Sequence, residues 1–261
     1  MKTFCFTVDD NIRCLKELNE GDFSSIFEHP YLGVYRRLHD KYDLKIQLNL
    51  FYEAGDFNLS RFTDKYRGEW AKNADWLKLS FHARAEKSRI YESSDYAEVF
   101  DDLSRTNREI IRFASESALA RTTTIHYCLA TEGGIRAVRE CGLIGLLGLY
   151  GTPDEPRSSY TSDKSDGDKI RRGEIAIRDG IAYSGVDIVL NSYSKEENLA
   201  RLEELSWREH INVMIHEQYF YPDYPKYQSD FEEKLDAVFA LLAQKGARSM
   251  FFEERIGDKE I

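Results

Sequence analysis

Residues 1–10, MKTFCFTVDD, are a short apolar run that leads directly into two adjacent aspartates. The run is too short in apolar length for a signal peptide, and we interpret it as the first strand of the fold. In a β/α barrel the chemical groups lie at the carboxyl ends of the strands. A strand that ends in Asp9 and Asp10 therefore predicts both a fold class and the position of a site.

The same pattern recurs along the chain. Runs rich in β-branched and aromatic residues alternate about eight times with segments of helical spacing, as is typical of βα units around a parallel sheet. The predicted strands are 2–8, 44–52, 76–82, 122–128, 143–150, 186–190, 211–216 and 248–253. An α/β chain of 261 residues ordinarily forms one domain. We therefore expect a single distorted, TIM-like (β/α) barrel over residues 1–261.

Helices are predicted between these strands. Apolar residues recur at three- and four-residue steps over 96–111 and 231–242. Pro30 can open another helix, and Thr131 can cap one that ends at Gly142.

The segment 152–185 departs from this rhythm. It is polar at first, and Asp179-Gly180 then separates two short apolar runs, which predicts a β-hairpin. We expect a hairpin insertion that lies over one end of the barrel, either as an inert surface feature or as a flap over the site.

The composition bears on partners and location. The net charge is −10 and no run of Lys and Arg offsets it, so neither nucleic acid nor a membrane surface is an expected partner. No stretch approaches the roughly 20 apolar residues that span a bilayer. The 4 cysteines have no C-x-x-C spacing, which favours buried thiols in a reducing compartment and predicts a cytoplasmic protein.

Four predicted strands end in polar residues, and these ends contain three of the 6 histidines. They are Thr7-Val8-Asp9-Asp10, Leu79-Ser80-Phe81-His82, Thr124-Ile125-His126-Tyr127 and Met214-Ile215-His216-Glu217. Such a repetition is hard to assign to core packing alone. We expect Asp9, Asp10, His82 and His216 to converge in one pocket.

The two aspartates are expected to differ in role. Side chains alternate along a strand, so Asp9 and Asp10 point in different directions, and one can bind while the other acts as a base. The alternative is that they leave the strand and cap the next turn.

His82 and Glu86 form a His-x-x-x-Glu pair. If the chain turns helically there, both side chains share a face, and together with Asp10 they could hold a divalent metal with positions open for water and substrate. The alternative is a hydrogen-bonded histidine beside a solvated glutamate.

An aromatic loop, Gln218-Tyr219-Phe220-Tyr221, follows His216 and Glu217. The rings of Tyr219 and Tyr221 could contact a sugar face, with Glu217 as a further substrate contact, and His216 can supply a proton near neutral pH. The alternative is that the rings pack on the barrel rim. The remaining histidines, which do not end strands, are interpreted as structural: His29, His39 and His210.

These residues resemble, in order and placement, the motifs of the polysaccharide deacetylase superfamily. Thr7-Val8-Asp9-Asp10 is similar to that family's T-F-D-D motif, His82 to the first histidine of its H-x-x-x-H motif, and Met214-Ile215-His216 to its late histidine motif. The resemblance implies a distorted βα barrel that deacetylates N-acetylated sugars with a divalent metal. It implies further that Asp9 is the general base, that Asp10 and His82 bind metal, and that His216 protonates the leaving group.

Two positions depart from this pattern. Glu86 stands where the family has its second metal-binding histidine, and 124–127 replaces an arginine- and proline-containing motif. We predict Glu86 as the third ligand, while His126 could supply the missing imidazole or contact the substrate. A carboxylate ligand makes the site less selective, so we expect zinc first and manganese, magnesium or iron as alternatives.

The leading hypothesis is therefore a metal-dependent hydrolase that deacetylates an N-acetylated carbohydrate. The first alternative is a metal-free glycosidase that pairs Asp10 with Glu86 or Glu217, for which the carboxylates must lie roughly 5 to 9 Å apart. The second alternative is a non-catalytic barrel that binds carbohydrate.

Overall fold

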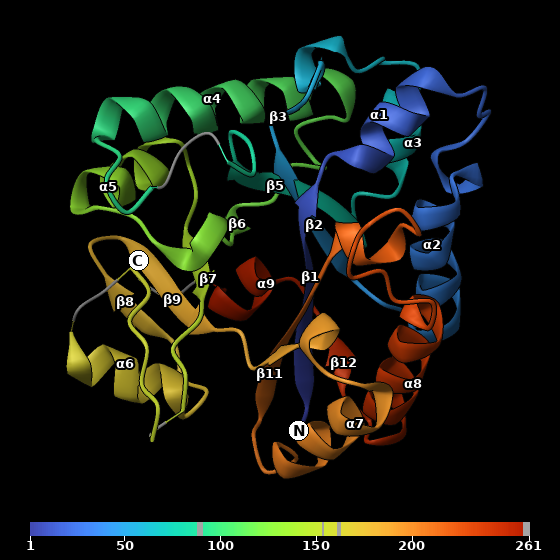
Figure 1. The fold of residues 1–261 in the computed structure, drawn as a ribbon. Coiled ribbons are helices and arrows are strands. Elements are labelled where there is room, and N and C mark those ends of the chain that lie inside the picture. Colours follow the sequence, from blue (N-terminus) through green and yellow to red (C-terminus); the bar gives the residue numbers. More distant parts are fainter. Residues whose placement is uncertain (88–90, 153, 161–162, 258–261) are drawn as a thin grey trace.

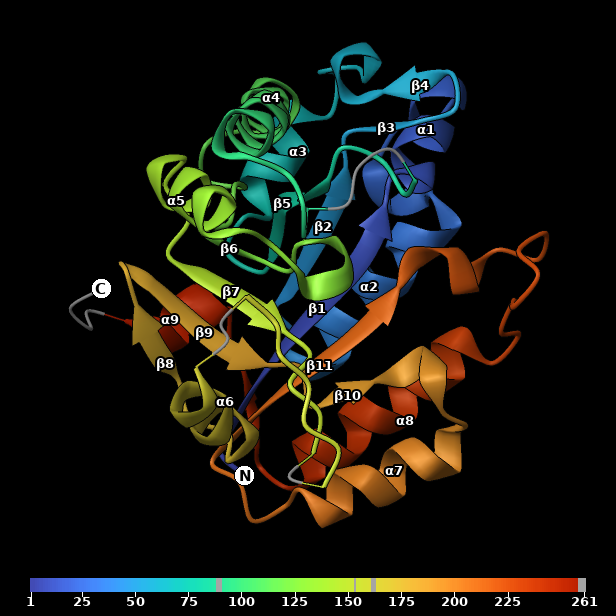
Figure 2. The same ribbon diagram turned by 60° about the vertical axis from the view of Figure 1, so that its left-hand side comes forward.

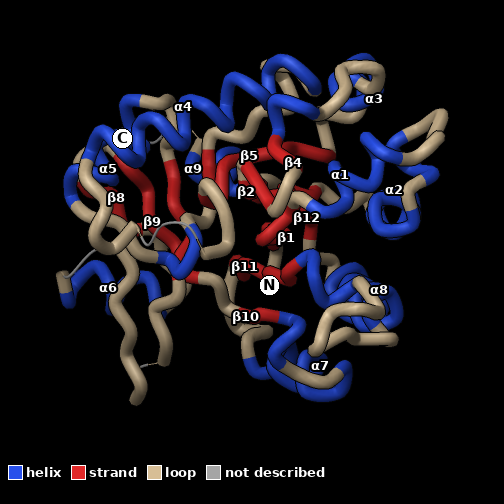
Figure 3. The backbone as a smooth tube through the Cα atoms, turned by 45° about the horizontal axis from the view of Figure 1, so that its top comes forward, coloured by secondary structure: helices blue, strands red, loops and turns tan. Residues whose placement is uncertain are grey.

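The computed structural model describes residues 1–87, 91–152, 154–160 and 163–257. Parallel strands form its centre and helices cover their outer side (Figures 1 and 3). The order of the elements agrees with the predicted alternation, and each predicted strand overlaps an observed one. Because the strands are buried, their sequences are nearly continuous apolar runs.

The larger sheet has the order β10-β11-β1-β2-β5, and β12 pairs in addition with β1. All of these pairings are parallel. The strands are β1 (Thr3–Asn11), β2 (Ile46–Phe51), β5 (Leu77–Ala83), β10 (Ile188–Val189), β11 (His210–His216) and β12 (Arg248–Ser249). The carboxyl ends of the long strands therefore lie on one side of the molecule.

The smaller sheet has the order β6-β7-β9-β8. Its strands are β6 (Thr122–Thr123), β7 (Gly145–Gly148), β8 (Ala176–Arg178) and β9 (Ile181–Gly185). The hairpin predicted at Asp179-Gly180 is confirmed, and both turn residues have positive φ, 51° and 78°. Its predicted position is wrong: β9 pairs in parallel with β7, so the hairpin belongs to the sheet and does not lie over one end. Within the sheet Ile181 and Ala182 are fully buried, which favours this position over one on the surface.

The two sheets curve toward each other as a distorted barrel (Figure 2). On one side, β9 runs on through Val186 and Asp187 into β10, and Val186 donates to β7 while Asp187 donates to β11. On the other side, a single bridge joins Leu79 of β5 to Leu119, just before β6. Within the described residues, the barrel strands therefore form two sheets joined by these links, and not one closed sheet.

The helices are α1 (Arg13–Glu20), α2 (Pro30–Tyr42), α3 (Arg67–Lys72), α4 (Tyr96–Phe113), α5 (Glu132–Glu140), α6 (Lys164–Arg171), α7 (Lys195–Glu204), α8 (Phe231–Gln244) and α9 (Phe252–Ile256). The short 3₁₀ helices are η1 (Ile26–Glu28), η2 (Leu59–Arg61), η3 (His126–Cys128), η4 (Leu190–Ser192) and η5 (Glu217–Phe220). A small hairpin pairs β3 (Glu53–Ala54) with β4 (Phe57–Asn58).

The predicted helix signals are confirmed. Pro30 is at the start of α2, the Thr131 side chain accepts a hydrogen bond from the Gly134 N–H, and Gly142 follows α5 with φ 89°. Among the described residues, none of the helices combines the length and the apolarity that a membrane crossing requires.

Candidate metal centre and its cleft

Asp10 is set apart from Asp9 by its backbone. The pairing of β1 with β2 is irregular between Val8 and Asn11, and Asp10 has φ 64°, in the left-handed region that aspartate tolerates better than most residues. Its Oδ2 accepts a hydrogen bond of 2.7 Å from Gln218 Nε2. Its Oδ1 is buried and has no hydrogen-bond partner that satisfies standard geometry.

His82, near the end of β5, directs its second ring nitrogen at that oxygen. Its Nδ1 donates to the Thr124 carbonyl, which leaves Nε2 to face Asp10 Oδ1 at 3.0 Å. Burial disfavours the charged ring, but Asp9 and Asp10 outweigh this and raise the pKa of His82. The ring is therefore poised to hold a cation, either a proton or a metal, between itself and the carboxylate.

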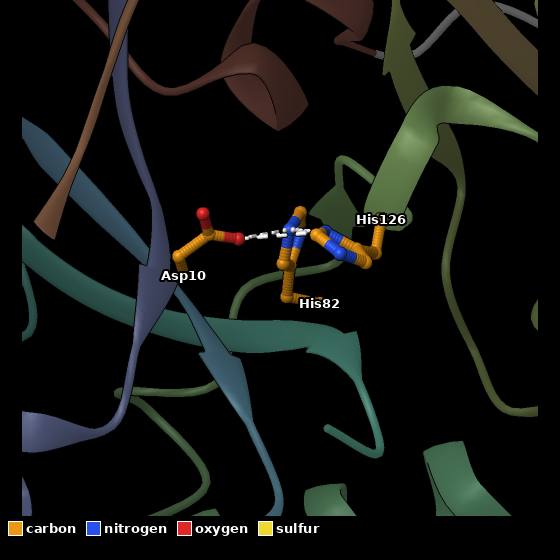
Figure 4. Close-up of side chains that lie close together, drawn as sticks. All are labelled: Asp10, His82 and His126. Carbon is orange, nitrogen blue, oxygen red and sulfur yellow. Dashed lines mark hydrogen bonds and ion pairs between the residues drawn. The ribbon is translucent and has the colours of Figure 1, made fainter. Parts of the chain in front are cut away.

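His126, at the start of η3, completes the group. Its Nδ1 lies 3.0 Å from His82 Nε2 and 3.4 Å from Asp10 Oδ1. The three side chains come from separate elements and point toward one another (Figure 4). Among the described residues this is the one group of three metal-ligating side chains whose ligand atoms all lie within 4.8 Å of one another.

These separations fit a metal ion. Metal–ligand bonds of roughly 2.0–2.1 Å in a tetrahedral arrangement place the ligand atoms about 3.3 to 3.4 Å apart. The observed separations of 3.0 to 3.4 Å are close to this value. Asp10 Oδ1 fits such a site best, because this buried carboxylate oxygen faces both imidazole nitrogens, and a buried carboxylate is costly unless a cation lies beside it.

Glu86 lies elsewhere in the same region. It is exposed, lines the mouth of the cleft, and is outside the group formed by Asp10, His82 and His126. The structure thus brings His126, rather than Glu86, next to the two other predicted ligands. The sequence signal for His126 was its position at a strand end, but its proximity to His82, 44 residues earlier, has no local signature.

Asp9 and His216 flank this group on neighbouring strands and pair in the β1–β11 register. Asp9 is 1% exposed, accepts a hydrogen bond of 2.6 Å from Asn49 Nδ2, and has a pKa that burial raises. The half-buried His216 has Nδ1 2.8 Å from Asn191 Oδ1. An amide oxygen can only accept, so Nδ1 carries a proton and donates it to Asn191, which leaves Nε2 free for proton transfer. Asn49 and Asn191 were not singled out from the sequence, because neither ends a strand in a recognisable motif.

One cleft of about 870 Å³ is lined by Asp9, Asp10, His82, His126 and His216. The predicted convergence of the strand-end groups is therefore confirmed. A second pocket of about 630 Å³ adjoins it and shares four lining residues with it. They are Asp10, Glu86, Gln218 and Tyr224.

The three substrate contacts predicted on the late loop have different surroundings. Glu217 is 1% exposed, and its carboxylate accepts the backbone N–H groups of Ile12, Arg13 and Cys14 at 2.7, 3.0 and 2.7 Å. It thus caps the start of α1, and capping was the alternative role considered for Asp9 and Asp10 from the sequence. Tyr221 is buried and donates to Glu217.

Tyr219, by contrast, lines the cleft and lies with its ring centre 6.2 Å from that of His216. It is therefore the one residue of the three on the late loop that is placed to meet a ligand in the main cleft.

Tyr127 adds a feature that the sequence did not predict. Tyr127 and Cys128 both have positive φ, 62° and 58°, which is strained for residues other than glycine. The Tyr127 side chain is 58% exposed, lines the cleft, and has its ring centre 4.0 Å from that of His126. Its strain is therefore not offset by burial of its own ring.

No protein-family model matches this chain, and no curated protein sequence matches it at a significant level. Solved structures do resemble it. A family 4 acetyl xylan esterase from Clostridium thermocellum, solved with a cobalt ion, has TM-score 0.57 and 12% identity over 98% of this chain and 90% of that chain. A peptidoglycan N-acetylglucosamine deacetylase has TM-score 0.54 and 11% identity over 97% and 86% of the two chains.

A 4-alpha-glucanotransferase from Thermococcus litoralis has TM-score 0.64 and 10% identity, over 99% of this chain but only 41% of that chain. At these identities the similarity establishes the fold. The chain has the distorted α/β barrel fold found in the carbohydrate deacetylases, which confirms the fold that the sequence resemblance implied.

Proposed function

We propose that this chain is a divergent member of the polysaccharide deacetylase superfamily and removes an acetyl group from an N-acetylated carbohydrate with a divalent metal ion. One observation carries the proposal: Asp10 Oδ1, His82 Nε2 and His126 Nδ1 converge at 3.0 to 3.4 Å, and the three side chains are buried. The fold shared with carbohydrate deacetylases supports the same conclusion.

The metal would be held by Asp10, His82 and His126. A divalent ion bound there would polarise the acetyl carbonyl and acidify water. One carboxylate and two imidazoles suit zinc first, with manganese and iron as alternatives, whereas magnesium prefers oxygen ligands. Glu86 lies outside this group and is retained as an alternative ligand.

Asp9 and His216 would move the protons. Asp9 would accept a proton from the attacking water as its oxygen bonds to the carbonyl carbon, and burial of Asp9 raises its pKa in the direction a base requires. The C–N bond then breaks, and His216 Nε2 would give a proton to the departing amine. Asn191 would keep that nitrogen available by accepting from Nδ1.

Substrate contacts would come from the exposed rings of the cleft. Tyr219, beside His216, and Tyr127, beside His126, both line it, and aromatic rings suit the face of a sugar. One structural neighbour is a peptidoglycan N-acetylglucosamine deacetylase, and an N-acetylated sugar as the substrate of this chain agrees with that similarity. The described cysteines are all free, which supports our proposal of a cytoplasmic location.

Acetate release from N-acetylglucosamine oligomers tests this function. The metal-loaded protein should release acetate, a chelator should abolish release, and Asp9→Asn should lower kcat by about 10²- to 10⁴-fold with the Tm little changed. Asp43→Asn, at an aspartate that ends α2, is the matched control and should retain full activity. Acetate release that survives chelation would rule out the metal-dependent reaction.

A second candidate is a glycosidase or glycosyltransferase that uses paired carboxylates. The fold similarity to the 4-alpha-glucanotransferase favours it. Glu217 is engaged by the α1 backbone, so Asp10 and Glu86 would have to form the pair. Chelator-resistant cleavage of a glycosidic bond would support this candidate, and recovery of intact ligand after long incubation would support a non-catalytic binding barrel.

A further inference from the structure

Three cations line the main cleft, and each comes from a different part of the chain. Arg157 lies in the segment after β7, Arg201 lies on α7, and Lys226 lies in the loop after η5. Figure 2 shows the segment after β7 running across the front of the sheets toward α7. The cations are thus assembled by the fold and do not form a run in the sequence.

These cations lack direct ion-pair partners among the described residues. Arg157, Arg201 and Lys226 form no ion pair with any carboxylate in the described part of the chain. A nearby arginine behaves differently, since Arg208 pairs with Asp187. Five carboxylates also line this cleft, namely Asp9, Asp10, Glu86, Glu155 and Asp187, but none of them pairs with these three cations, which therefore remain available to a ligand.

Arg201 is held in place without using its donors. Its guanidinium lies over the Tyr193 ring, 3.7 Å from the ring centre, and its N–H groups have no acceptor among the described residues. Stacking of this kind orients the planar group and leaves its fork of donors free for a carboxylate or a phosphate. Arg201 therefore has the properties of an anion-binding side chain.

One ligand could reach both parts of the cleft. The cations and the centre formed by Asp10, His82 and His126 line the same space of about 870 Å³, which is within the range of small-molecule sites. We propose that the N-acetylated sugar bound here carries an anionic group, a carboxylate or a phosphate, that Arg201 binds together with Arg157 and Lys226. This inference rests on the proposed function and specifies its substrate class.

Calorimetric titration of the full chain, as purified and after chelation, tests the inference apart from catalysis. The ligands are N-acetylglucosamine, N-acetylmuramic acid and N-acetylglucosamine 1-phosphate, which are neutral, carboxylated and phosphorylated. At least one charged sugar should bind about tenfold more tightly than the neutral one, with an advantage that falls as salt is added. The better of the two charged ligands identifies the anion.

The variants decide which residues bind the anion. Arg201→Gln should weaken binding of the charged ligand about tenfold, because its guanidinium is already oriented by stacking. Arg157→Gln or Lys226→Gln should weaken that binding about threefold, as expected for an exposed charge pair. Arg248→Gln is the matched control, because it removes the same charge from an exposed residue of β12, which pairs with the amino-terminal end of β1.

Equal affinities for the three sugars, including no measurable binding of any, would overturn the inference, as would equal effects of Arg201→Gln and Arg248→Gln. Acetate release is followed in parallel, so that the two proposals fail separately. Selective anion binding without acetate release would contradict the proposed function only. Equal acetate release from neutral and charged sugars would contradict the inference only.

Discussion

The identity of the third metal ligand has a measurable thermal consequence. A metal that binds only the folded chain stabilises it by about 2.7 kcal/mol at a hundred times its Kd. An unfolding entropy of about 2.1 cal/mol/K per residue gives about 0.55 kcal/mol/K for 261 residues. Zinc or manganese at that concentration should therefore raise the Tm of the chelated protein by about 5 °C.

Ligand variants should divide sharply in this assay. His126→Ala removes one of the three atoms that lie within 4.8 Å of one another, so the metal-induced rise should fall below about 1 °C at the same metal concentration. Glu86→Gln alters an exposed residue outside that group and should keep the full rise. Each variant is compared with its own chelated form by differential scanning calorimetry, which removes any change in intrinsic stability.

The opposite pattern would refute this assignment. A full rise in His126→Ala together with loss of the rise in Glu86→Gln would return the ligand role to Glu86. No rise in the unaltered protein with any divalent ion would show that Asp10, His82 and His126 hold a proton rather than a metal.

Three further predictions concern the centre and its support. Glu217→Ala should lower the free energy of unfolding, measured in urea, by at least about 3 kcal/mol, because three backbone N–H groups at the start of α1 lose their acceptor. Glu217→Gln should lower it much less. Lost sugar affinity at unchanged stability would instead favour a substrate contact. Tyr127→Gly relieves a left-handed backbone conformation that costs roughly 1 kcal/mol, so the Tm of the variant should stay the same or rise by up to about 2 °C. Calorimetry should show sugar binding about threefold to tenfold weaker, because the ring is lost. An unstable variant with normal sugar affinity would show that Tyr127 has a structural role. Burial lowers the pKa of His82, but Asp9 and Asp10 raise it more, so that the pKa lies above the ordinary 6.5. The charged ring therefore stabilises the chelated protein fully below pH 6.5, and this stabilisation is lost as the pH rises through the raised pKa. Metal displaces the same proton, and the metal-induced rise in Tm should therefore be larger at about pH 8 than at about pH 6, a dependence that a pH-independent rise would contradict.

The sequence by itself determined the βα alternation, the helix signals and the ends of the strands. These are local properties: a strand, a cap or a turn depends on a few neighbouring residues, as at Pro30, Thr131 and Asp179-Gly180. The direction of the strands then follows from the alternation, since parallel strands bring their carboxyl ends to one side. This is why Asp9, Asp10, His82 and His216 could be predicted to share one cleft.

Only the tertiary structure decided which of these side chains meet. His126 reaches His82 because the chain around Leu119 lies beside β5, an adjacency that no pattern within either segment encodes. Glu217 likewise caps a helix that begins more than 200 residues earlier in the sequence, because β11 and β1 are neighbours in the sheet. Contacts of this kind depend on which strands pair and on how far each chain turns after its strand, and packing across the whole barrel determines both.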